Sequence, residues 1–489
     1  MGLAGVSTVV ADALPAPSGQ VKGGGVQPRT AEIFDLRGMM EPLLRHGLPS
    51  EPVSGHFGGL PVPLDCRPWH TRHLYPASIP QGRIEKFLTG RLAEYGITVR
   101  RGHRLIAVEP DADGVTATVH DHATGTDLRV RSRYLVACDG AHSTVRTLLG
   151  VPFPGLPGTR PAVLADVRLT SVSDLVPAGN GPFATMVRDD GGYWSMLNPL
   201  GDGRYRFVFG PLEPSEADQR NDRPVSPGEI SGALHAVWGG DTELGEIASS
   251  SRFSDATRQV ERYRVGRVLF AGDAAHIHPP LGGQGLNLGI QDAFNLGWKL
   301  AAEVHGRAPD GLLDSYHTER HPVAADVLHH VQAQRVLADR RPSPDVAALR
   351  DIVTDLARLP DANRHLAGMV SGLDLRYPMP GDSHPLLGLR MPDIDLMIDG
   401  VPTPMSALMH TGRGLLLDLT GDAHLAEALG DHHGIDLRRA TPGEHIDVAA
   451  VLVRPDGHIC WISPTGDMAG FETALRHWFG TTAGSIRRR

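Results

Sequence analysis

The chain has few lysines, few cysteines and no long apolar run. Only three of its 47 basic residues are lysines, so arginine supplies almost all of the positive charge. The formal net charge of −9 gives no indication of a surface for nucleic acid or anionic membranes. The three cysteines, Cys66, Cys138 and Cys460, are far apart and fit neither a disulfide framework nor a CxxC pair.

No apolar segment reaches the ~18–20 residues that a membrane-spanning helix needs, and the chain begins with no signal-peptide pattern. We therefore expect a cytoplasmic protein without membrane or nucleic-acid partners. The 25 histidines show no zinc-like spacing with a nearby third ligand, so we expect no metal site. A GxSxG motif is also missing, which argues against a serine hydrolase.

The length of 489 residues predicts two or three domains. Residues 161–261 consist of short apolar segments and turns, which predicts a separate antiparallel lobe. Residues 386–489 have the pattern of a small α/β module. The two remaining stretches, 1–160 and 262–380, are assigned to one discontinuous α/β domain, with residues 311–380 mainly helical.

Helices are predicted over residues 31–48, 81–95 and 286–305. The second has apolar positions every three to four residues. Residues 7–12 are expected to form a buried strand because they are rich in β-branched side chains.

The strongest local signal runs from Gly272 to Asn287. A strand that ends in Gly-Asp leads into a glycine loop stiffened by proline, and then into a helix start. Glycines allow backbone N–H groups to approach a ligand closely, and a helix N-terminus carries a partial positive charge. This pattern predicts a cradle for an anionic cofactor, in which Asp273 could accept a hydrogen bond from a polyol. The alternative is an ordinary strand–turn–helix with an aspartate cap.

Three weaker signals lie earlier in the chain. Asp12 ends a predicted strand, where a carboxylate can bind ribose hydroxyls in a dinucleotide-binding unit. Arg146 follows an apolar strand and an Asp139-Gly140 turn, so it could reach a phosphate or form a structural ion pair with Asp139. Gln81 lies in the first turn of a predicted helix, where its amide suits a ribityl chain or is simply solvated.

Together these residues resemble the class A flavoprotein monooxygenases, specifically the aromatic-polyketide hydroxylases of the angucycline and anthracycline type. Asp12, Gln81, the Asp139–Arg146 motif and the Gly272–Asn287 stretch occur in the family's order, and the resemblance covers essentially the whole chain. It implies an α/β fold with a Rossmann-like FAD-binding domain, an inserted antiparallel-sheet substrate domain, and a C-terminal thioredoxin-like domain that lacks CxxC.

The resemblance also implies which residues bind FAD. In the N-terminal part, Asp12 would hold the adenosine ribose, Lys22 would lie near the phosphates, and Gln81 would contact the ribityl chain or pyrophosphate. Arg146 belongs to the same cofactor-binding set.

In the glycine loop, Asp273 would hold a ribityl hydroxyl and Pro280 would line the isoalloxazine ring. The backbone N–H groups that face the N1 and C2 edge of the flavin would come from Gly283, Gly285, Leu286 and Asn287.

The implied reaction uses NADPH or NADH to reduce FAD, after which O2 forms a flavin C4a-hydroperoxide. A polycyclic phenol then attacks the distal oxygen as a carbon nucleophile. The cofactor carries this chemistry, so no catalytic side chain is assigned. The enzyme would be a monomer or homodimer. Its presumed apolar substrate contacts are Phe57, Trp69, Tyr193, Trp194 and Met196.

One departure from the family pattern concerns the N-terminus. The family begins with a strand and a GxGxxG motif, whereas this sequence starts where the following helix should end. We expect either a misassigned start codon, which we favour, or the loss of a complete FAD site. The missing strand would lie mid-sheet, so apolar edges should be exposed without it.

Two rival functions stay open at this point. One is a flavin-free truncated homologue with a non-redox, dehydratase-like role or a partner-binding role in a biosynthetic pathway. The other is an antibiotic-inactivating or catabolic flavin hydroxylase.

Overall fold

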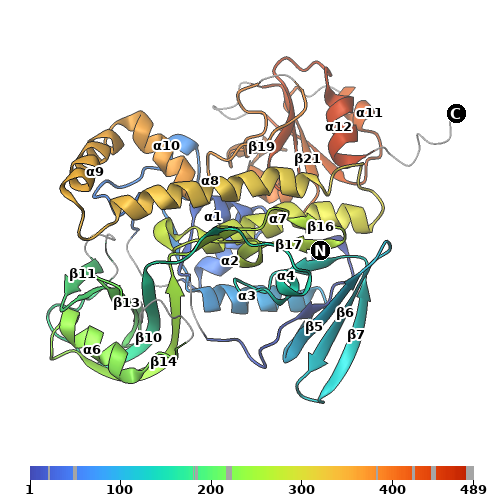
Figure 1. The fold of residues 1–489 in the computed structure, drawn as a ribbon. Coiled ribbons are helices and arrows are strands. Elements are labelled where there is room, and N and C mark those ends of the chain that lie inside the picture. Colours follow the sequence, from blue (N-terminus) through green and yellow to red (C-terminus); the bar gives the residue numbers. More distant parts are fainter. Residues whose placement is uncertain are drawn as a thin grey trace.

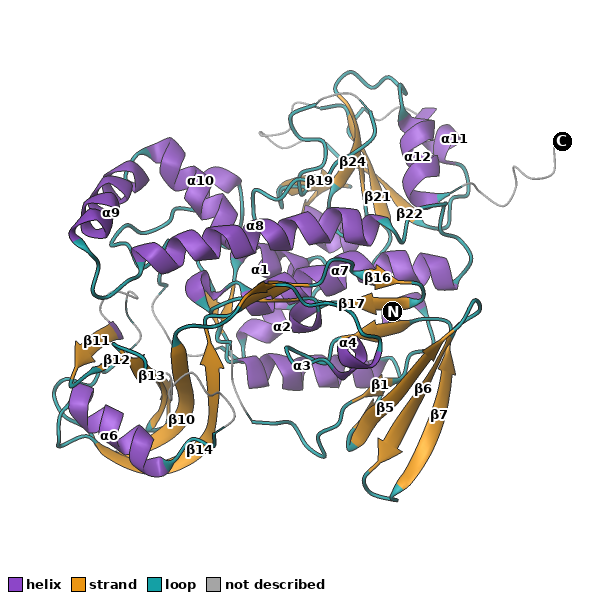
Figure 2. Ribbon diagram, in the orientation of Figure 1, coloured by secondary structure: helices purple, strands orange, loops and turns teal. Residues whose placement is uncertain are grey.

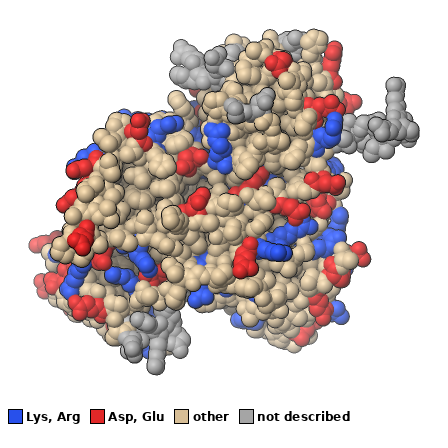
Figure 3. Space-filling model, turned by 45° about the horizontal axis from the view of Figure 1, so that its top comes forward, with Lys and Arg blue, Asp and Glu red and all other residues tan. Residues whose placement is uncertain are grey.

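The computed structural model describes residues 1–19, 23–47, 52–179, 181, 186–215, 223–381, 384–420, 424–441 and 448–480. Figures 1 and 2 show the long helix α8 (Ser315–Leu337) running across the molecule, with an antiparallel-sheet lobe below one end and a C-terminal lobe above the other. On the face drawn in Figure 3, acidic and basic side chains are interspersed. Among the described residues, no helix is long and apolar enough to cross a membrane.

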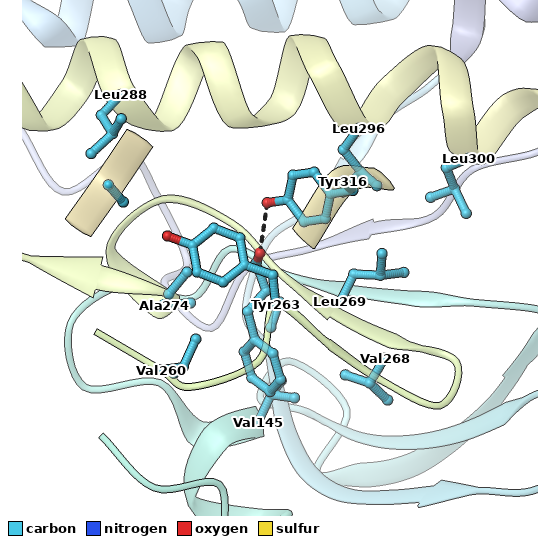
Figure 4. Close-up of a cluster of buried hydrophobic side chains, with 14 of the residues drawn as sticks. Val145, Val260, Tyr263, Val268, Leu269, Ala274, Leu288, Leu296, Leu300 and Tyr316 are labelled. Atoms are coloured by element: carbon cyan, nitrogen blue, oxygen red, sulfur yellow. Dashed lines mark hydrogen bonds between the residues drawn. The ribbon is translucent and has the colours of Figure 1, made fainter. Parts of the chain in front are cut away.

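The central part of the molecule packs two long helices against a small sheet. The sheet has the order β16 (Arg264–Val265), β17 (Val268–Phe270), β8 (Leu135–Ala137), and β17 runs parallel to β8. Helix α7 (Gly285–Val304) contributes buried leucines and α8 contributes Tyr316 (Figure 4). The Tyr316 hydroxyl donates to the Phe270 carbonyl at 2.7 Å, so the only polar atom of this buried ring is paired.

A second pair of parallel strands is separate from this sheet. Strand β1 (Val10–Ala11) pairs with β4 (Val99–Arg100), and within the described residues neither strand joins β8. Apolar side chains are exposed beside both edges, with Val9 50% and Val136 37% accessible. That a further strand belongs between them stays a prediction.

Two predicted elements differ from the structure. The helix expected over residues 31–48 is two helices, α1 (Pro28–Asp35) and α2 (Met40–Leu44). They are separated at Gly38, whose φ of 62° is left-handed and cannot continue an α-helix. The strand expected over residues 7–12 is only the two-residue β1. The other two predicted helices are observed, as α3 (Gln81–Glu94) and α7.

The antiparallel lobe is a five-stranded sheet with the order β11 (Val187–Asp190), β12 (Tyr193–Gly201), β13 (Arg204–Pro211), β10 (Pro161–Ser171), β14 (Glu243–Ser254). Helix α6 (Pro227–Trp238) covers one face, where alternate residues of the strands form an apolar core with it. Trp238 anchors this helix by donating from Nε1 to the Ser195 hydroxyl at 2.7 Å. The opposite face of the sheet is therefore free of α6.

The C-terminal lobe has a four-stranded sheet with the order β22 (Ile435–Arg439), β21 (Gly414–Asp418), β23 (Ala450–Val453), β24 (Ile459–Ser463). The β21–β22 pair is parallel and the other two pairs are antiparallel. Helices α11 (His424–Leu429) and α12 (Phe471–Phe479) accompany it. Strand β22 was not expected from the sequence.

The remaining elements are β2 (Gly25–Val26), β3 (Ala77–Ser78), β5 (His103–Pro110), β6 (Val115–Asp121), β7 (Thr126–Ser132), α4 (Thr144–Leu148), β9 (Gly155–Leu156), β15 (Thr257–Gln259), β18 (His276–Ile277), α9 (Pro344–Ala357), α10 (Pro360–Ser371), β19 (Asp395–Ile398) and β20 (Val401–Pro404). They include an antiparallel sheet of three strands, in the order β5-β6-β7.

A buried ionic network joins the C-terminal lobe to α7 and α8. Arg454 is fully buried and donates to both Glu319 oxygens, at 2.6 and 2.9 Å, and also to Asp456. Lys299 of α7 donates to Glu319 at 2.7 Å. Burial alone would raise the pKa of Glu319, but Arg454 and Lys299 hold it down at about 2. Removing one charge would leave the others buried and uncompensated.

We predict that Glu319→Gln lowers the free energy of unfolding by about 3–5 kcal/mol, because Lys299 and Arg454 lose their shared counter-charge. The measurement is the melting temperature, Tm, of each variant, with thermal unfolding monitored by circular dichroism. The matched control is Glu472→Gln, since Glu472 forms an exposed pair with Arg476 and its side chain is 83% accessible. Equal Tm values for the two variants would contradict the prediction.

Candidate cofactor site

The Gly272–Asn287 stretch forms a loop that ends at the N-terminus of α7. Gly272, Gly282 and Gly283 have φ values of 59°, 70° and 64°, in the left-handed region that favours glycine. Gly283 is exposed, and the first N–H groups of the 20-residue α7 follow it. Because the first N–H groups of a helix have no partner within the helix, this turn can donate hydrogen bonds to an anion.

Asn287 ties this loop to a segment some 260 residues earlier. Its Oδ1 accepts from the Gln27 backbone N–H at 2.8 Å, and its Nδ2 donates to the carbonyls of Gly25 at 3.0 Å and Gly283 at 2.8 Å. Gln27 returns a bond from Nε2 to the Gly282 carbonyl at 2.9 Å. The side chain of Asn287 is thus committed to positioning the glycine turn.

Gln81 extends the same cluster from α3. Its Oε1 accepts from the Gly23 N–H at 3.0 Å, and its Nε2 donates to Glu85 at 2.7 Å. A Cβ atom on Gly23 would lie 3.3 Å from the Leu286 side chain, closer than ordinary packing. The structure therefore brings together Gln81, Gly283, Leu286 and Asn287 around residues 23–27.

The carboxylate of Asp292 holds the Gly-Asp turn against α7. It accepts from the Gly272 N–H at 3.2 Å, from His276 Nε2 at 2.7 Å and from Arg320 Nε at 2.8 Å. Complete burial acts to raise the pKa of Asp292, but the charges of Arg320 and His276 keep it below its usual value. Helix α7 can approach closely because residue 289 is glycine, where a Cβ would be 3.2 Å from Gly272 Cα.

His278 is a residue of this loop to which the sequence analysis gave no cofactor role. Its Nδ1 donates to the Pro279 carbonyl at 2.8 Å, whereas its buried Nε2 has no partner. Burial lowers its pKa to about 4, so the ring is neutral at pH 7 and Nε2 is an acceptor. This nitrogen lies 3.7 Å from the position of a Cβ on Gly285. The described residues contain no cluster of three groups that could hold a metal.

The other predicted cofactor residues are not part of the hydrogen-bonded cluster around Asn287. Asp12 forms an ion pair with Arg101 and accepts from the Leu14 N–H. Arg146 donates to the carbonyls of Ala274 and Ala141, at 3.1 and 2.7 Å, and burial lowers its pKa. Lys22 lies outside the described residues. Asp273 and Pro280 are exposed on the glycine loop.

These features fit a flavin. The turn presents a helix N-terminus and the exposed Gly283, which has no Cβ atom, and the neutral His278 lies beside Gly285. Together these features suit a flat, polar ring that becomes anionic on reduction. None of the contacts described links Asp12 to the glycine turn. The cofactor-binding roles of Asp12, Lys22 and Arg146 therefore stay predictions.

A cavity of about 480 Å³ lies elsewhere, between β9, β15 and α8, where its lining includes Arg258, His321 and His329. None of the predicted cofactor residues lines it. We place the candidate site at the glycine turn and not at this cavity. The choice rests on the N–H groups at the start of α7, which can donate hydrogen bonds to an anionic cofactor, and not on cavity size.

Comparisons with known proteins identify the family of the chain. An FAD binding domain family matches residues 1–331, and an aromatic-ring hydroxylase C-terminal family matches residues 384–482. The chain is 45% identical to 12-dehydrotetracycline 5-monooxygenase/anhydrotetracycline 6-monooxygenase of Streptomyces rimosus, over 98% of this chain and 95% of the relative. It is 42% identical to the rifampicin monooxygenase of Streptomyces venezuelae, over 99% and 96%.

A solved structure is also similar over nearly the full length. CabE, an aromatic hydroxylase from angucycline biosynthesis, is 39% identical and superimposes with a TM-score of 0.87, covering 98% of this chain and 96% of CabE. The expected resemblance to the aromatic-polyketide hydroxylases is thereby confirmed. The chain belongs to the FAD-dependent aromatic-ring hydroxylases, a family of flavin monooxygenases.

Proposed function

We propose that the chain hydroxylates an aromatic polyketide or a related polycyclic phenol, with FAD as cofactor, NADPH or NADH as electron donor, and O2 as oxygen source. The observation that carries the proposal is the glycine turn at the start of α7, held in place by Asn287, Gln27 and Asp292. Monooxygenation of aromatic antibiotics by relatives of similar length supports the substrate class.

In this proposal the N–H groups of Gly285, Leu286 and Asn287, at the start of α7, stabilise negative charge on the reduced flavin, whereas the Gly283 N–H donates to the Pro280 carbonyl at 3.2 Å. Asp273 holds a ribityl hydroxyl, Pro280 lines the ring, and Gln81 contacts the chain between ring and phosphates. Asp12, Lys22 and Arg146 serve the adenosine and phosphate end. When bound, the flavin activates O2 for transfer to an aromatic carbon; the residues named bind it, orient it and keep water away.

The substrate would lie between the glycine turn and the antiparallel lobe. Of the five presumed contacts, Trp194 and Met196 alternate with residues that face α6, so they lie on the face of the sheet without that helix. Tyr193 packs with the α6 core instead, and Phe57 and Trp69 pack near α10. Only Trp194 and Met196 are therefore kept as substrate contacts.

We also retain the domain boundaries of the sequence analysis as part of the proposal, with residues 386–489 as a thioredoxin-like module. One parallel strand pairing, β21 with β22, and two antiparallel pairings support this assignment. Cys460 lies on a strand of this module and has no neighbouring cysteine for redox chemistry.

The first test is to titrate the chain with FAD and follow the flavin absorption bands. We expect one FAD per chain, bleaching by NADPH or NADH without air, and return of the oxidised spectrum when air is admitted. A flavin that binds but resists both nicotinamides would contradict the proposed electron donor. A chain that binds no FAD would overturn the proposal and leave the flavin-free, non-redox rival.

We predict that Asn287→Ala weakens FAD binding roughly 10-fold or more, because the Gln27 N–H and the Gly25 and Gly283 carbonyls lose their shared partner and the turn loosens. The matched control is Asn363→Ala. Asn363 likewise accepts from a backbone N–H, that of Asp65, and donates to two carbonyls, those of Pro63 and Ala357. FAD affinity should be unchanged in the control, and comparable losses in both variants would argue against a specific role for Asn287.

A further inference from the structure

Four polar side chains form a row of successive cross-strand neighbours across the sheet of the antiparallel lobe. Asn198 of β12 is the cross-strand partner of Arg206 of β13, which pairs with Asp166 of β10, which in turn pairs with Ser249 of β14. Neighbouring strands are about 4.8 Å apart, so the row extends about 14 Å from Asn198 to Ser249. We refer to these four residues as the polar row.

The polar row lies on the face of the sheet that α6 does not cover. The residues that alternate with it, such as Ala165, Leu197 and Phe207, belong to the core beneath α6. Since side chains along a strand point to opposite faces in turn, Asp166, Asn198 and Arg206 project the other way.

At the centre of the polar row two residues form an ion pair, whereas the residues at its two ends each have a polar atom without a hydrogen-bond partner. Arg206 donates from Nε and Nη2 to the two oxygens of Asp166, both at 3.0 Å, and each side chain is only 9% accessible. Asn198 Oδ1 and Ser249 Oγ are shielded from solvent and have no hydrogen-bond partner. A buried polar atom without a partner is unfavourable, so both ends of the row require a group from outside the sheet.

The row lies beside the candidate cofactor site. Arg206 Nη1, which is not used by the bidentate pair with Asp166, is 3.9 Å from the position of a Cβ on Gly24. Gly24 belongs to the segment that Gln81 and Asn287 hold next to the start of α7. A ligand at the polar row would therefore also be near the glycine turn.

An apolar row runs next to the polar row on the same face. Met196, Val208 and Leu164 are successive cross-strand partners, each two residues along its strand from Asn198, Arg206 or Asp166. The face thus combines a flat apolar strip with a line of hydrogen-bonding groups along one side. Such a surface suits a flat ring system that carries its oxygens on one edge.

We propose that the polar row determines substrate specificity by binding the oxygenated edge of a hydroxylated polycyclic quinone or ketone. A substrate hydroxyl donates to Asn198 Oδ1, while a carbonyl oxygen accepts from Arg206 Nη1 or from the Ser249 hydroxyl. The ring carbons rest on Met196, Val208 and Leu164. This inference rests on the proposed function, and it narrows the substrate to molecules with a donor and an acceptor on the same edge.

The test measures equilibrium binding of two probes to the FAD-loaded chain, 2,3-dihydroxyanthraquinone, whose two hydroxyls can donate and accept on one edge of the ring system, and unsubstituted anthracene. Asn198→Ala and Ser249→Ala remove atoms that have no partner in the protein, so the fold should be retained. We expect each variant to weaken binding of the dihydroxyanthraquinone about 3- to 10-fold and to leave anthracene binding unchanged. Ser250→Ala is the matched control, because Ser250 pairs with Ala165 on the α6 side of the same strand.

A second variant tests the centre of the row. Asp166→Leu combined with Arg206→Met replaces the buried pair by apolar groups, an exchange that proteins often tolerate. We expect this double variant to bind anthracene better than the dihydroxyanthraquinone, the reverse of the unmodified chain.

Unchanged affinities for both probes in Asn198→Ala and Ser249→Ala would mean that the unpaired atoms bind only water, and would overturn the inference. A parallel loss for both probes would also overturn it, because the row would then have no selectivity for oxygen. The FAD affinity of each variant is measured separately. If the unmodified chain binds no FAD, the proposed function fails, and the same titrations on the flavin-free chain still decide the role of the row.

Discussion

The carboxylate of Asp292 is the interaction on which the centre of the structure depends. It lies in α7, is completely buried, and binds the Gly272 N–H, the His276 ring and the Arg320 guanidinium. Through these three bonds it fixes the Gly-Asp turn to α7 and α7 to α8. Burying the carboxylate and the guanidinium costs desolvation free energy. Once they are paired, any arrangement that separates them would leave a buried charge uncompensated, so the positions of the surrounding groups are restricted.

Local and long-range features of the candidate site differ in how well sequence could predict them. The glycine turn and the start of α7 were predictable, because left-handed φ angles and helix starts depend on a few adjacent residues. The bonds from Asn287 to Gly25 and Gln27 were not, since they join residues about 260 positions apart. The polar row escaped prediction for a related reason: Asp166 and Arg206 become neighbours only through strand register.

In the fold as well, local elements were easier to predict from the sequence than the contacts between them. Apolar periodicity predicted the helix over residues 81–95, which is observed. The single helix expected over residues 31–48 was wrong because the sequence pattern does not reveal that Gly38 takes a left-handed φ. Strand β22 alternates apolar and charged side chains from Ile435 to Arg438, but it was missed because it is only five residues long and is rich in charge. The antiparallel lobe has alternating segments separated by turns, and three strands of the C-terminal sheet are short apolar runs, so both patterns were clearer. Their strand orders still required three-dimensional contacts.

The scarcity of lysine has a practical consequence for labelling. Of the two lysines in the described residues, Lys299 is fully buried against Glu319, whereas Lys86 is exposed on α3. Lys86 lies five residues after Gln81 on the same helix, within reach of the candidate flavin site. Of these two lysines, an amine-reactive fluorophore would therefore label Lys86 and not Lys299, and a label on Lys86 would lie near the candidate flavin, where energy transfer reports on flavin occupancy.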